Sequence, residues 1–159
     1  MSNSSITIDR ATPEHDRIIA QHFYQLWLDN NIPADSICDD WLSRTVKFMQ
    51  DARRELEFQA FVARVENEIV GSASCQLFAG LYPAILKTQQ CKYGYIWNVY
   101  VEPQYRRGGI AIGLTKAAIA HLKSLNCTKA VLNASPSGKP VYEKLGFSSG
   151  NEMVLDLVD

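Results

Sequence analysis

The most informative part of this 159-residue sequence is Val99-Tyr100-Val101-Glu102-Pro103-Gln104-Tyr105-Arg106-Arg107-Gly108-Gly109-Ile110-Ala111. A run of strand character ends at Pro103, because proline cannot donate to a sheet ladder, and a helical pattern begins directly after the two glycines. Glycines allow backbone N–H groups to turn inward, and the following helix points its positive end at the same place. Together with Arg106 and Arg107, this arrangement predicts a site for a phosphate or pyrophosphate group. The alternative is a glycine-rich turn with exposed arginines.

Hydrophobic patterning places further elements on both sides of this stretch. Strands are predicted over residues 6–8, 58–65, 69–78, 94–101, 130–132 and 153–158. Helices are predicted from Thr12-Pro13 onward and over residues 35–56, 109–125 and 137–145, with a loop at 79–92. An antiparallel meander that feeds a strand-helix-strand unit is typical of a mixed α/β (α+β) fold rather than a doubly wound one. The length predicts a single domain over residues 1–159.

The composition excludes several classes of function. A formal net charge of −1 and 47% apolar residues are typical of an ordinary globular protein. This charge excludes electrostatic binding of nucleic acid or an anionic membrane by the chain as a whole. No apolar run approaches the length of a membrane span, and the polar N-terminus does not resemble a secretory signal, so a cytoplasmic location is expected. Reduced thiols and no metal site are expected, because no zinc-type spacing links the four cysteines, Cys38, Cys75, Cys91 and Cys127.

The charge is distributed unevenly along the chain. Residues 103–147 carry seven basic residues and one acidic residue, whereas residues 1–102 carry a net charge of −4. A basic segment within an acidic chain favours an anionic ligand bound at that segment, although solvated helix faces would produce the same pattern.

Two motifs in the basic segment resemble those of a known family. Arg106, Gly109 and Ala111 match the Gln/Arg-x-x-Gly-x-Gly/Ala phosphate loop of the GNAT superfamily, the acetyl-CoA-dependent N-acetyltransferases. A second stretch is similar to the family's Leu-Tyr-Glu-Lys-Leu-Gly-Phe signature, and its Tyr142 lies 31 residues after Ala111. That stretch reads Val141-Tyr142-Glu143-Lys144-Leu145-Gly146-Phe147. The resemblance carried by these motifs covers residues 94–147.

The resemblance implies a GNAT-type fold, with a central, mostly antiparallel mixed sheet of six to seven strands flanked by about four helices. It also implies a gap between the fourth and fifth strands that receives the pantetheine arm of acetyl-CoA, with no metal involved. Carried onto this sequence, the acetyl-CoA-binding residues are Val99, Tyr100, Val101, Arg106, Arg107, Gly108, Gly109, Ile110, Ala111, Ile112, Asn133 and Ser135. For the last two, Asn133 and Ser135, the alternative to cofactor binding is capping of the next helix by Ser135 or Ser137.

The same resemblance assigns a catalytic role to Tyr142. A phenol held near the thioester sulfur can donate a proton to the leaving thiolate, and the alternative is a tyrosine that only packs in the core. The general base is not identified, because Tyr95 and Ala130 occupy the two positions where some family members carry a glutamate, and Glu102 at the end of the strand is too near the cofactor loop. The alternatives are a base that acts through a water and an amine that enters already neutral. Tyr95, Trp97 and Asn98 are candidates for lining the acceptor pocket, with core packing as the alternative for the two aromatic residues.

These observations predict an enzyme that transfers an acetyl group from acetyl-CoA directly to a primary amine in a ternary complex. The amine would belong to a small molecule or to a peptide or protein, and a homodimer is an open possibility. The alternative is a GNAT-fold module that binds acyl-CoA without catalysis, as a sensor or interaction domain. The absence of a general base favours the alternative, whereas Tyr142 favours the enzyme.

Overall fold

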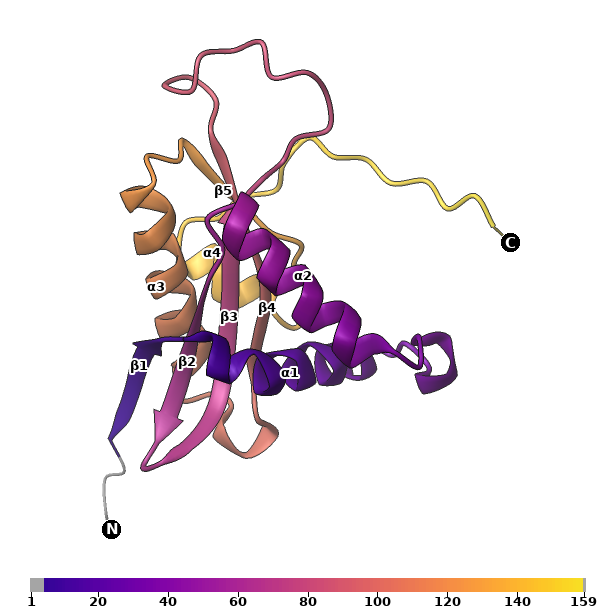
Figure 1. Cartoon of the computed structure of the whole chain (residues 1–159), viewed down its shortest axis with the longest axis vertical. Coiled ribbons are helices and arrows are strands. Elements are labelled where there is room, and N and C mark those ends of the chain that lie inside the picture. The colour runs from indigo at the N-terminus through magenta and orange to yellow at the C-terminus, as the bar shows by residue number, and fades with distance from the viewer. Residues whose placement is uncertain (1–4, 159) are drawn as a thin grey trace.

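The computed structural model describes residues 5–158 and shows one sheet with helices packed on both of its faces (Figure 1). Short 3-10 turns precede or follow several elements, at Pro13–His15, Ala34–Ser36 and Pro103–Tyr105. The helices are α1 (Asp16–Asp29), α2 (Trp41–Glu55), α3 (Ile110–Ser124) and α4 (Lys139–Lys144). The strands are β1 (Ile6–Arg10), β2 (Gln59–Val65), β3 (Glu68–Leu77), β4 (Tyr93–Val101) and β5 (Lys129–Val131).

The strands lie in the order β1-β2-β3-β4-β5. The first four pair antiparallel, and β2 and β3 form a hairpin whose turn includes Glu66 at a φ of +56°. β5 pairs parallel to β4, because the chain crosses over through α3 before it returns to the sheet. This arrangement confirms the predicted meander followed by a strand-helix-strand unit.

Alternation along the strands divides the core into two clusters. In β2, Phe61 and Ala63 face α3, whereas Ala60 and Val62 face α1 and α2. This division follows from the two-residue period of a strand, which points successive side chains to opposite faces of the sheet. The α1 and α2 helices thus cover one face of the sheet and α3 covers the other (Figure 1).

A buried ion pair joins the two helices on the first face. The Arg53 guanidinium in α2 donates to both carboxylate oxygens of Asp16 in α1, at 2.7 and 3.1 Å. Asp16 is buried, and a buried carboxylate lacks the hydrogen bonds that water would supply. The bidentate contact with Arg53 replaces those hydrogen bonds and so contributes to stability. The pair therefore ties the N-terminal end of α1 to the C-terminal part of α2.

Two sequence predictions need correction. The sheet has five strands rather than six to seven, because residues 153–158 run as exposed, irregular chain instead of a strand. Their alternating pattern is that of a strand, but a strand also needs a neighbour for its backbone groups, and none pairs with them in the described chain. The predicted helix over 35–56 begins only at Trp41. The expectation about the N-terminus falls largely on residues 1–4, which lie outside the described residues.

Candidate active site

A β-bulge in β4 shapes the site. Ser72 of β3 pairs with Tyr100 and Ser74 pairs with Trp97, so two residues of β4, Asn98 and Val99, face a single residue of β3. Asn98 adopts a φ of +53°, in the left-handed region. A bulge bends its strand and increases the local twist, and it thereby directs the end of β4 away from its regular course.

Beyond its first three residues, β4 has no strand of the described chain paired on the edge that faces β5. The parallel ladder joins only Tyr93, Gly94 and Tyr95 to β5, whereas β4 continues to Val101. No other strand in residues 5–158 pairs with this edge of β4. The ladder ends because β5 itself ends at Val131, so the edge of β4 from Ile96 to Val101 is unpaired in this part of the chain, where the family resemblance implies a gap. Two arms leave the ladder, namely β4 after Tyr95 and the chain that follows β5. One arm leads into the glycine-arginine loop and α3, and the other leads through Asn133 and Ser135 into α4.

The glycine-arginine loop presents the N-terminus of α3 beside the end of β4. Gly109 is the N-cap of α3 at a φ of +82°, and a Cβ at this position would meet no atom within 4 Å. The N–H of Gly113 bonds to the Gly109 carbonyl, so the N–H groups before it have no partner within the helix. Free N–H groups, a positive helix end and open space suit a phosphate group.

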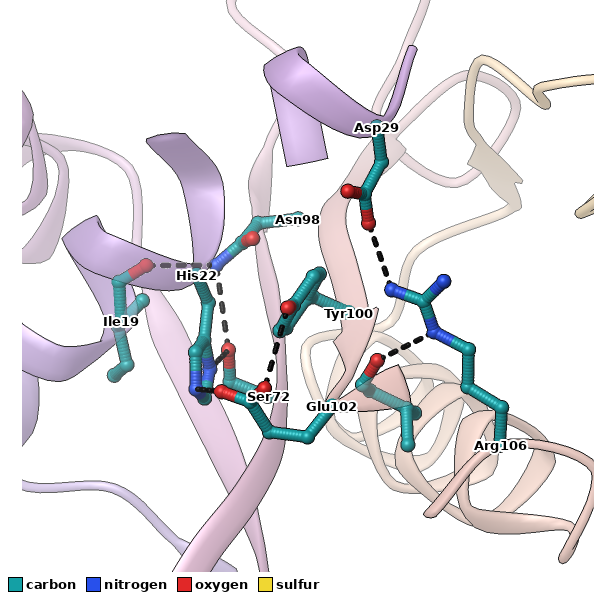
Figure 2. Close-up of polar contacts among 9 residues, drawn as sticks. Ile19, His22, Asp29, Ser72, Asn98, Tyr100, Glu102 and Arg106 are labelled. Carbon is teal, nitrogen blue, oxygen red and sulfur yellow. Dashed lines mark hydrogen bonds and ion pairs between the residues drawn. The ribbon is translucent and has the colours of Figure 1, made fainter. Parts of the chain in front are cut away.

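The two arginines of the loop have different surroundings. Arg106 donates from Nε to the Val101 carbonyl at 2.8 Å and from Nη2 to Asp29 at 2.7 Å (Figure 2). Its guanidinium also lies over the Tyr100 ring, 5.5 Å from the centroid. Arg107 is exposed at a φ of +67°, and no contact of its side chain is found within the described part of the chain. Arg107 is therefore the arginine whose charge is available to a ligand.

The other residues assigned to cofactor binding on β4 face opposite sides of the sheet. Val99 and Val101 pack in the cluster beneath α3, whereas Tyr100 faces α1, where its ring lies 4.9 Å from that of His22. A strand running beside a ligand can offer it backbone groups whichever way its side chains point, so this placement suits backbone contacts. Ile110, Ala111 and Ile112 form the first turn of α3.

A buried polar network connects α1 to the bulge (Figure 2). His22 Nδ1 lies 2.8 Å from Ser72 Oγ, and the Asn98 side-chain amide donates to the Ile19 carbonyl at 3.2 Å. His22 Nε2 lies 3.7 Å from a Glu102 carboxylate oxygen, and the Tyr100 hydroxyl donates to the other at 3.5 Å. Asn98 is thus fixed against α1 rather than directed into open space.

Burial lowers the pKa of His22 to about 4. The Glu102 carboxylate acts in the opposite direction, but it is 35% exposed and too far away for a hydrogen bond, so burial dominates. His22 is therefore neutral at physiological pH. The proton belongs on Nε2, which faces the carboxylate, so that Nδ1 accepts from the Ser72 hydroxyl.

A hydrogen bond joins the two arms where they leave the ladder. The Asn133 amide donates to the Tyr95 hydroxyl at 2.8 Å, and the Tyr95 ring stacks on Phe78. Ser135 Oγ accepts from the Gly138 N–H at 3.2 Å. Ser135 therefore stabilises the turn before α4, whose N-cap, Gly138, has no side-chain capping hydrogen bond.

Trp97 packs among aromatic side chains of the helical face. Its ring contacts Phe23, Phe48 and Phe58 with centroids 5.1, 5.6 and 6.0 Å away, and its Nε1–H donates to Gln76 at 3.1 Å. Trp97 is therefore partly buried against the cluster beneath α1 and α2, and its place in the acceptor pocket stays a prediction.

Tyr142 lies on the β5 arm. It projects from α4, packs edge-on against Phe147 with centroids 5.9 Å apart, and lines a groove together with residues of β5 and α3. Burial raises its pKa, so the phenol keeps its proton at neutral pH and can serve as a donor.

Comparison with known proteins agrees with this geometry. The family model described as "Acetyltransferase (GNAT) family" matches residues 17–147. The chain belongs to this family. The glucosamine 6-phosphate N-acetyltransferase of Trypanosoma brucei brucei is 33% identical over 100 residues, which cover 62% of this chain and 65% of that protein. Human N-alpha-acetyltransferase 30 is 33% identical over 90 residues, covering 55% of this chain and 23% of that protein.

The crystal structure of a predicted acetyltransferase from Clostridium acetobutylicum, determined with acetyl-CoA, has the same fold. Its TM-score is 0.82 at 24% identity, with 96% of this chain and 97% of that chain covered. The matches to the two curated relatives span less than two thirds of each of those proteins.

Within this GNAT chain, the network around His22 was not predicted. The sequence shows three histidines at helical positions but no partner for any of them, and Ser72 lies 50 residues from His22. Cys75 is a poor candidate for a nucleophile, because burial raises the pKa of its thiol to about 12. Residues 5–158 contain neither a cluster of metal-ligating side chains nor a helix long and apolar enough to cross a membrane.

Proposed function

We propose that this protein is an acetyl-CoA-dependent N-acetyltransferase that acts on a primary amine in a ternary complex. The observation that carries the proposal is the unpaired edge of β4 beyond its ladder with β5. The β4 arm ends at the free N–H groups of α3, and the arm after β5 carries a half-buried, protonated phenol, Tyr142. Acetyl-CoA supplies an acetyl group already activated as a thioester.

The residues of the β4 arm fit two parts of acetyl-CoA, the anionic pyrophosphate and the amides of the pantetheine. The N-terminus of α3 and the Arg107 side chain are available to the pyrophosphate, because neither is engaged by other described residues. The unpaired edge of β4 from Ile96 to Val101 offers backbone groups to the pantetheine amides, in the manner of an added strand. Asn133 and Tyr95 lie where the two arms separate.

Tyr142 acts as the general acid in this proposal. The amine nitrogen forms the new bond to the acetyl carbon, the carbon–sulfur bond breaks, and Tyr142 gives its proton to the departing sulfur. The amine must lose a proton as well. Tyr95 and Ala130 stand at the positions where the family resemblance places a glutamate in some members, so in this proposal the proton passes to solvent.

Thiol release from acetyl-CoA tests the proposal directly. The panel contains peptides with free N-termini, amino sugars and aminoglycosides, with an amine-free reaction as the baseline. Amine-dependent release together with an acetylated product of the correct mass is the expected result. Tight binding of acetyl-CoA without release by any amine would instead support the non-catalytic acyl-CoA-binding module. The acceptor and the cytoplasmic location stay predictions.

A further inference from the structure

A chain of aromatic side chains crosses the face of the sheet that α1 and α2 cover. Trp27 of α1 packs against Phe23 with ring centroids 5.9 Å apart, and Phe23 packs against Trp97 of β4 at 5.1 Å. Phe48 of α2 meets the same Trp97 ring at 5.6 Å. Three elements that are distant in the sequence thus contribute to one continuous aromatic surface, and we call these four rings the aromatic wall.

Both ends of the aromatic wall are open to solvent. Trp27 is 46% exposed and Phe48 is 50% exposed, whereas Phe23 and Trp97 between them are partly buried. Large apolar rings that are half in water gain free energy when another apolar group covers them. Connected surfaces of this kind mark the sites where proteins bind ligands.

The aromatic wall borders the unpaired edge of β4. Trp97 lies within that edge, and Tyr95, two residues earlier, lies on the same face of the strand. Tyr95 stacks on Phe78, which is 38% exposed, and the Tyr95 hydroxyl accepts from Asn133 on the arm that follows β5. The apolar surface therefore extends to the place where the two arms leave the ladder.

The position of Tyr142 decides from which face an amine approaches. Tyr142 shares its groove with Ile119 and Leu122 of α3, on the opposite face of the sheet from α1 and α2 (Figure 1). A leaving sulfur directed toward Tyr142 leaves the acetyl carbon accessible from the face that carries the aromatic wall. An amine that attacks from this face brings the group attached to its nitrogen against the wall.

The charged side chains next to Phe48 are paired with one another. On α2, Arg44 binds Asp40 and Lys47 binds Asp51, and each pair has an N–O distance of 2.6 Å. These cations already have carboxylate partners, so a phosphate on the acceptor would have to displace a carboxylate to bind them. The surroundings of Phe48 therefore favour an uncharged group.

Polar groups at the other positions of the wall are engaged as well. The Trp97 Nε1–H donates to Gln76 at 3.1 Å. Asp29, two residues after Trp27, accepts from Gln25 at 3.1 Å and from Arg106 at 2.7 Å. The wall thus presents apolar ring faces to an acceptor, rather than partners for a phosphate or for several ammonium groups.

We propose that the acceptor is a primary amine whose amino group lies within a few bonds of an aromatic or branched apolar group, and that this group packs on the aromatic wall. The inference rests on the proposed function and names the class of its acceptor. Arylalkylamines share this chemistry with peptides whose first side chain is apolar. In both, burial of the apolar group would hold the amino group at the edge of β4.

Thiol release from acetyl-CoA tests this preference with two matched pairs of acceptors. Phenylethylamine is compared with methoxyethylamine at equal concentrations of free base, and a tripeptide amide that begins with phenylalanine is compared with one that begins with serine. The apolar member should have a kcat/KM at least about 30-fold higher in one pair or both, and the pair that responds identifies the source of the amine. Equal kcat/KM values within both pairs, or a higher value for glucosamine 6-phosphate than for every apolar amine, would overturn the inference.

Substitutions at the two exposed ends locate the preference on the wall. Trp27→Ala and Phe48→Ala should each raise the KM of the preferred amine at least about tenfold while kcat stays within about threefold, because the rings bind the acceptor and take no part in bond formation. Trp27→Phe keeps a ring and should recover most of the loss. Ile6→Ala is the matched control, since Ile6 is also 46% exposed but lies on β1 at the opposite edge of the sheet. Wild-type KM values in both alanine variants would contradict the inference.

Binding measured without turnover separates this inference from the proposed function. The chain has three tryptophans, and in ¹⁵N-labelled protein with CoA the indole N–H signals of Trp27 and Trp97 should shift when phenylethylamine or the phenylalanine peptide is added. The signal of Trp41, which stacks on Tyr24 outside the wall, should not shift. These shifts without thiol release from any amine would support the wall and refute catalysis. Thiol release without these shifts would refute the wall and leave the acetyltransferase intact, and absence of both would refute both.

Discussion

A guanidinium nitrogen of Arg106 lies 2.7 Å from a carboxylate oxygen of Asp29, and this ion pair ties the glycine-arginine loop to the C-terminal end of α1 (Figure 2). Both side chains are partly exposed, so the pair alone contributes modestly to stability. The pair matters because it positions the loop: Arg106 also donates to the Val101 carbonyl at the end of β4, so it links α1, β4 and the loop. The charge of Arg106 is thus balanced within the protein, whereas that of Arg107 is not.

The two arginines should therefore respond differently to substitution. Arg107→Ala should leave the melting temperature unchanged and weaken acetyl-CoA binding about tenfold, the loss expected for one charge-assisted contact. Arg106→Ala should lower the melting temperature as well, because it removes the contacts to Asp29 and Val101. Calorimetric titration and thermal denaturation of both variants check this contrast. Wild-type affinity in Arg107→Ala would remove Arg107 from the site.

Substitutions at the two glycines of the loop distinguish the effect of ligand contact on affinity from the effect of backbone strain on stability. A Cβ at Gly108 would meet only the Tyr105 carbonyl, at 3.6 Å, which is an ordinary contact. Gly108→Ala should therefore fold normally, and it should bind acetyl-CoA at least tenfold more weakly if a phosphate packs on the loop. Gly109→Val should also block binding but lose about 1–2 kcal/mol of stability, because its φ is +82°. Unchanged affinity in Gly108→Ala, measured by calorimetry, would contradict close approach of a ligand to this loop.

Tyr142→Phe should separate turnover from binding. The ring and its packing on Phe147 stay, and only the proton donor is lost, so kcat should fall about 100-fold while the dissociation constant of acetyl-CoA stays within twofold. Tyr93→Phe is the matched control, since Tyr93 lines the same groove. Steady-state thiol release with the best acceptor measures both variants. Equal kcat values for Tyr142→Phe and the wild type would leave Tyr142 as a packing residue.

The buried His22 predicts that stability falls in mild acid. Because burial lowers its pKa from 6.5 to about 4, the unfolded chain binds this proton at a higher pH than the folded protein does. The stability contributed by neutral His22 is fully present above pH 6.5 and is lost as the pH falls toward 4, by at most about 3 kcal/mol. Urea unfolding between pH 4 and 8 measures this slope.

His22→Gln provides the control for that measurement. Glutamine retains a polar side chain in the network but does not titrate, so the variant should be less stable at pH 7 and show a smaller loss of stability between pH 6.5 and 4. A pH slope equal to that of the wild type would assign the acid sensitivity to other groups.

The pH dependence of turnover should follow the acceptor amine. With solvent taking the amine proton, kcat/KM should keep rising with pH toward the pKa of the amine itself. Profiles for two acceptors of different basicity, after correction for protein stability, should be displaced from each other accordingly. A plateau below about pH 7 for both amines would reveal a tuned base in the protein.

The sequence by itself determined the local elements and the two motifs. The predicted meander, the crossover helix and the loop at 79–92 agree with the structure because hydrophobic period, proline and glycine act over a few residues. The glycine-arginine loop and the Tyr142 motif could be recognised from the sequence for the same reason, because each occupies one short stretch of chain.

Only the tertiary structure decided which distant residues meet. Arg106 and Asp29 are 77 residues apart, and nothing local to either residue selects the other. The bulge at Asn98 exists only relative to β3, because a bulge is a mismatch between two paired strands. Residues 153–158 have the alternation of a strand, yet they form none in a single chain, since the free energy of a strand comes from the neighbour that satisfies its backbone.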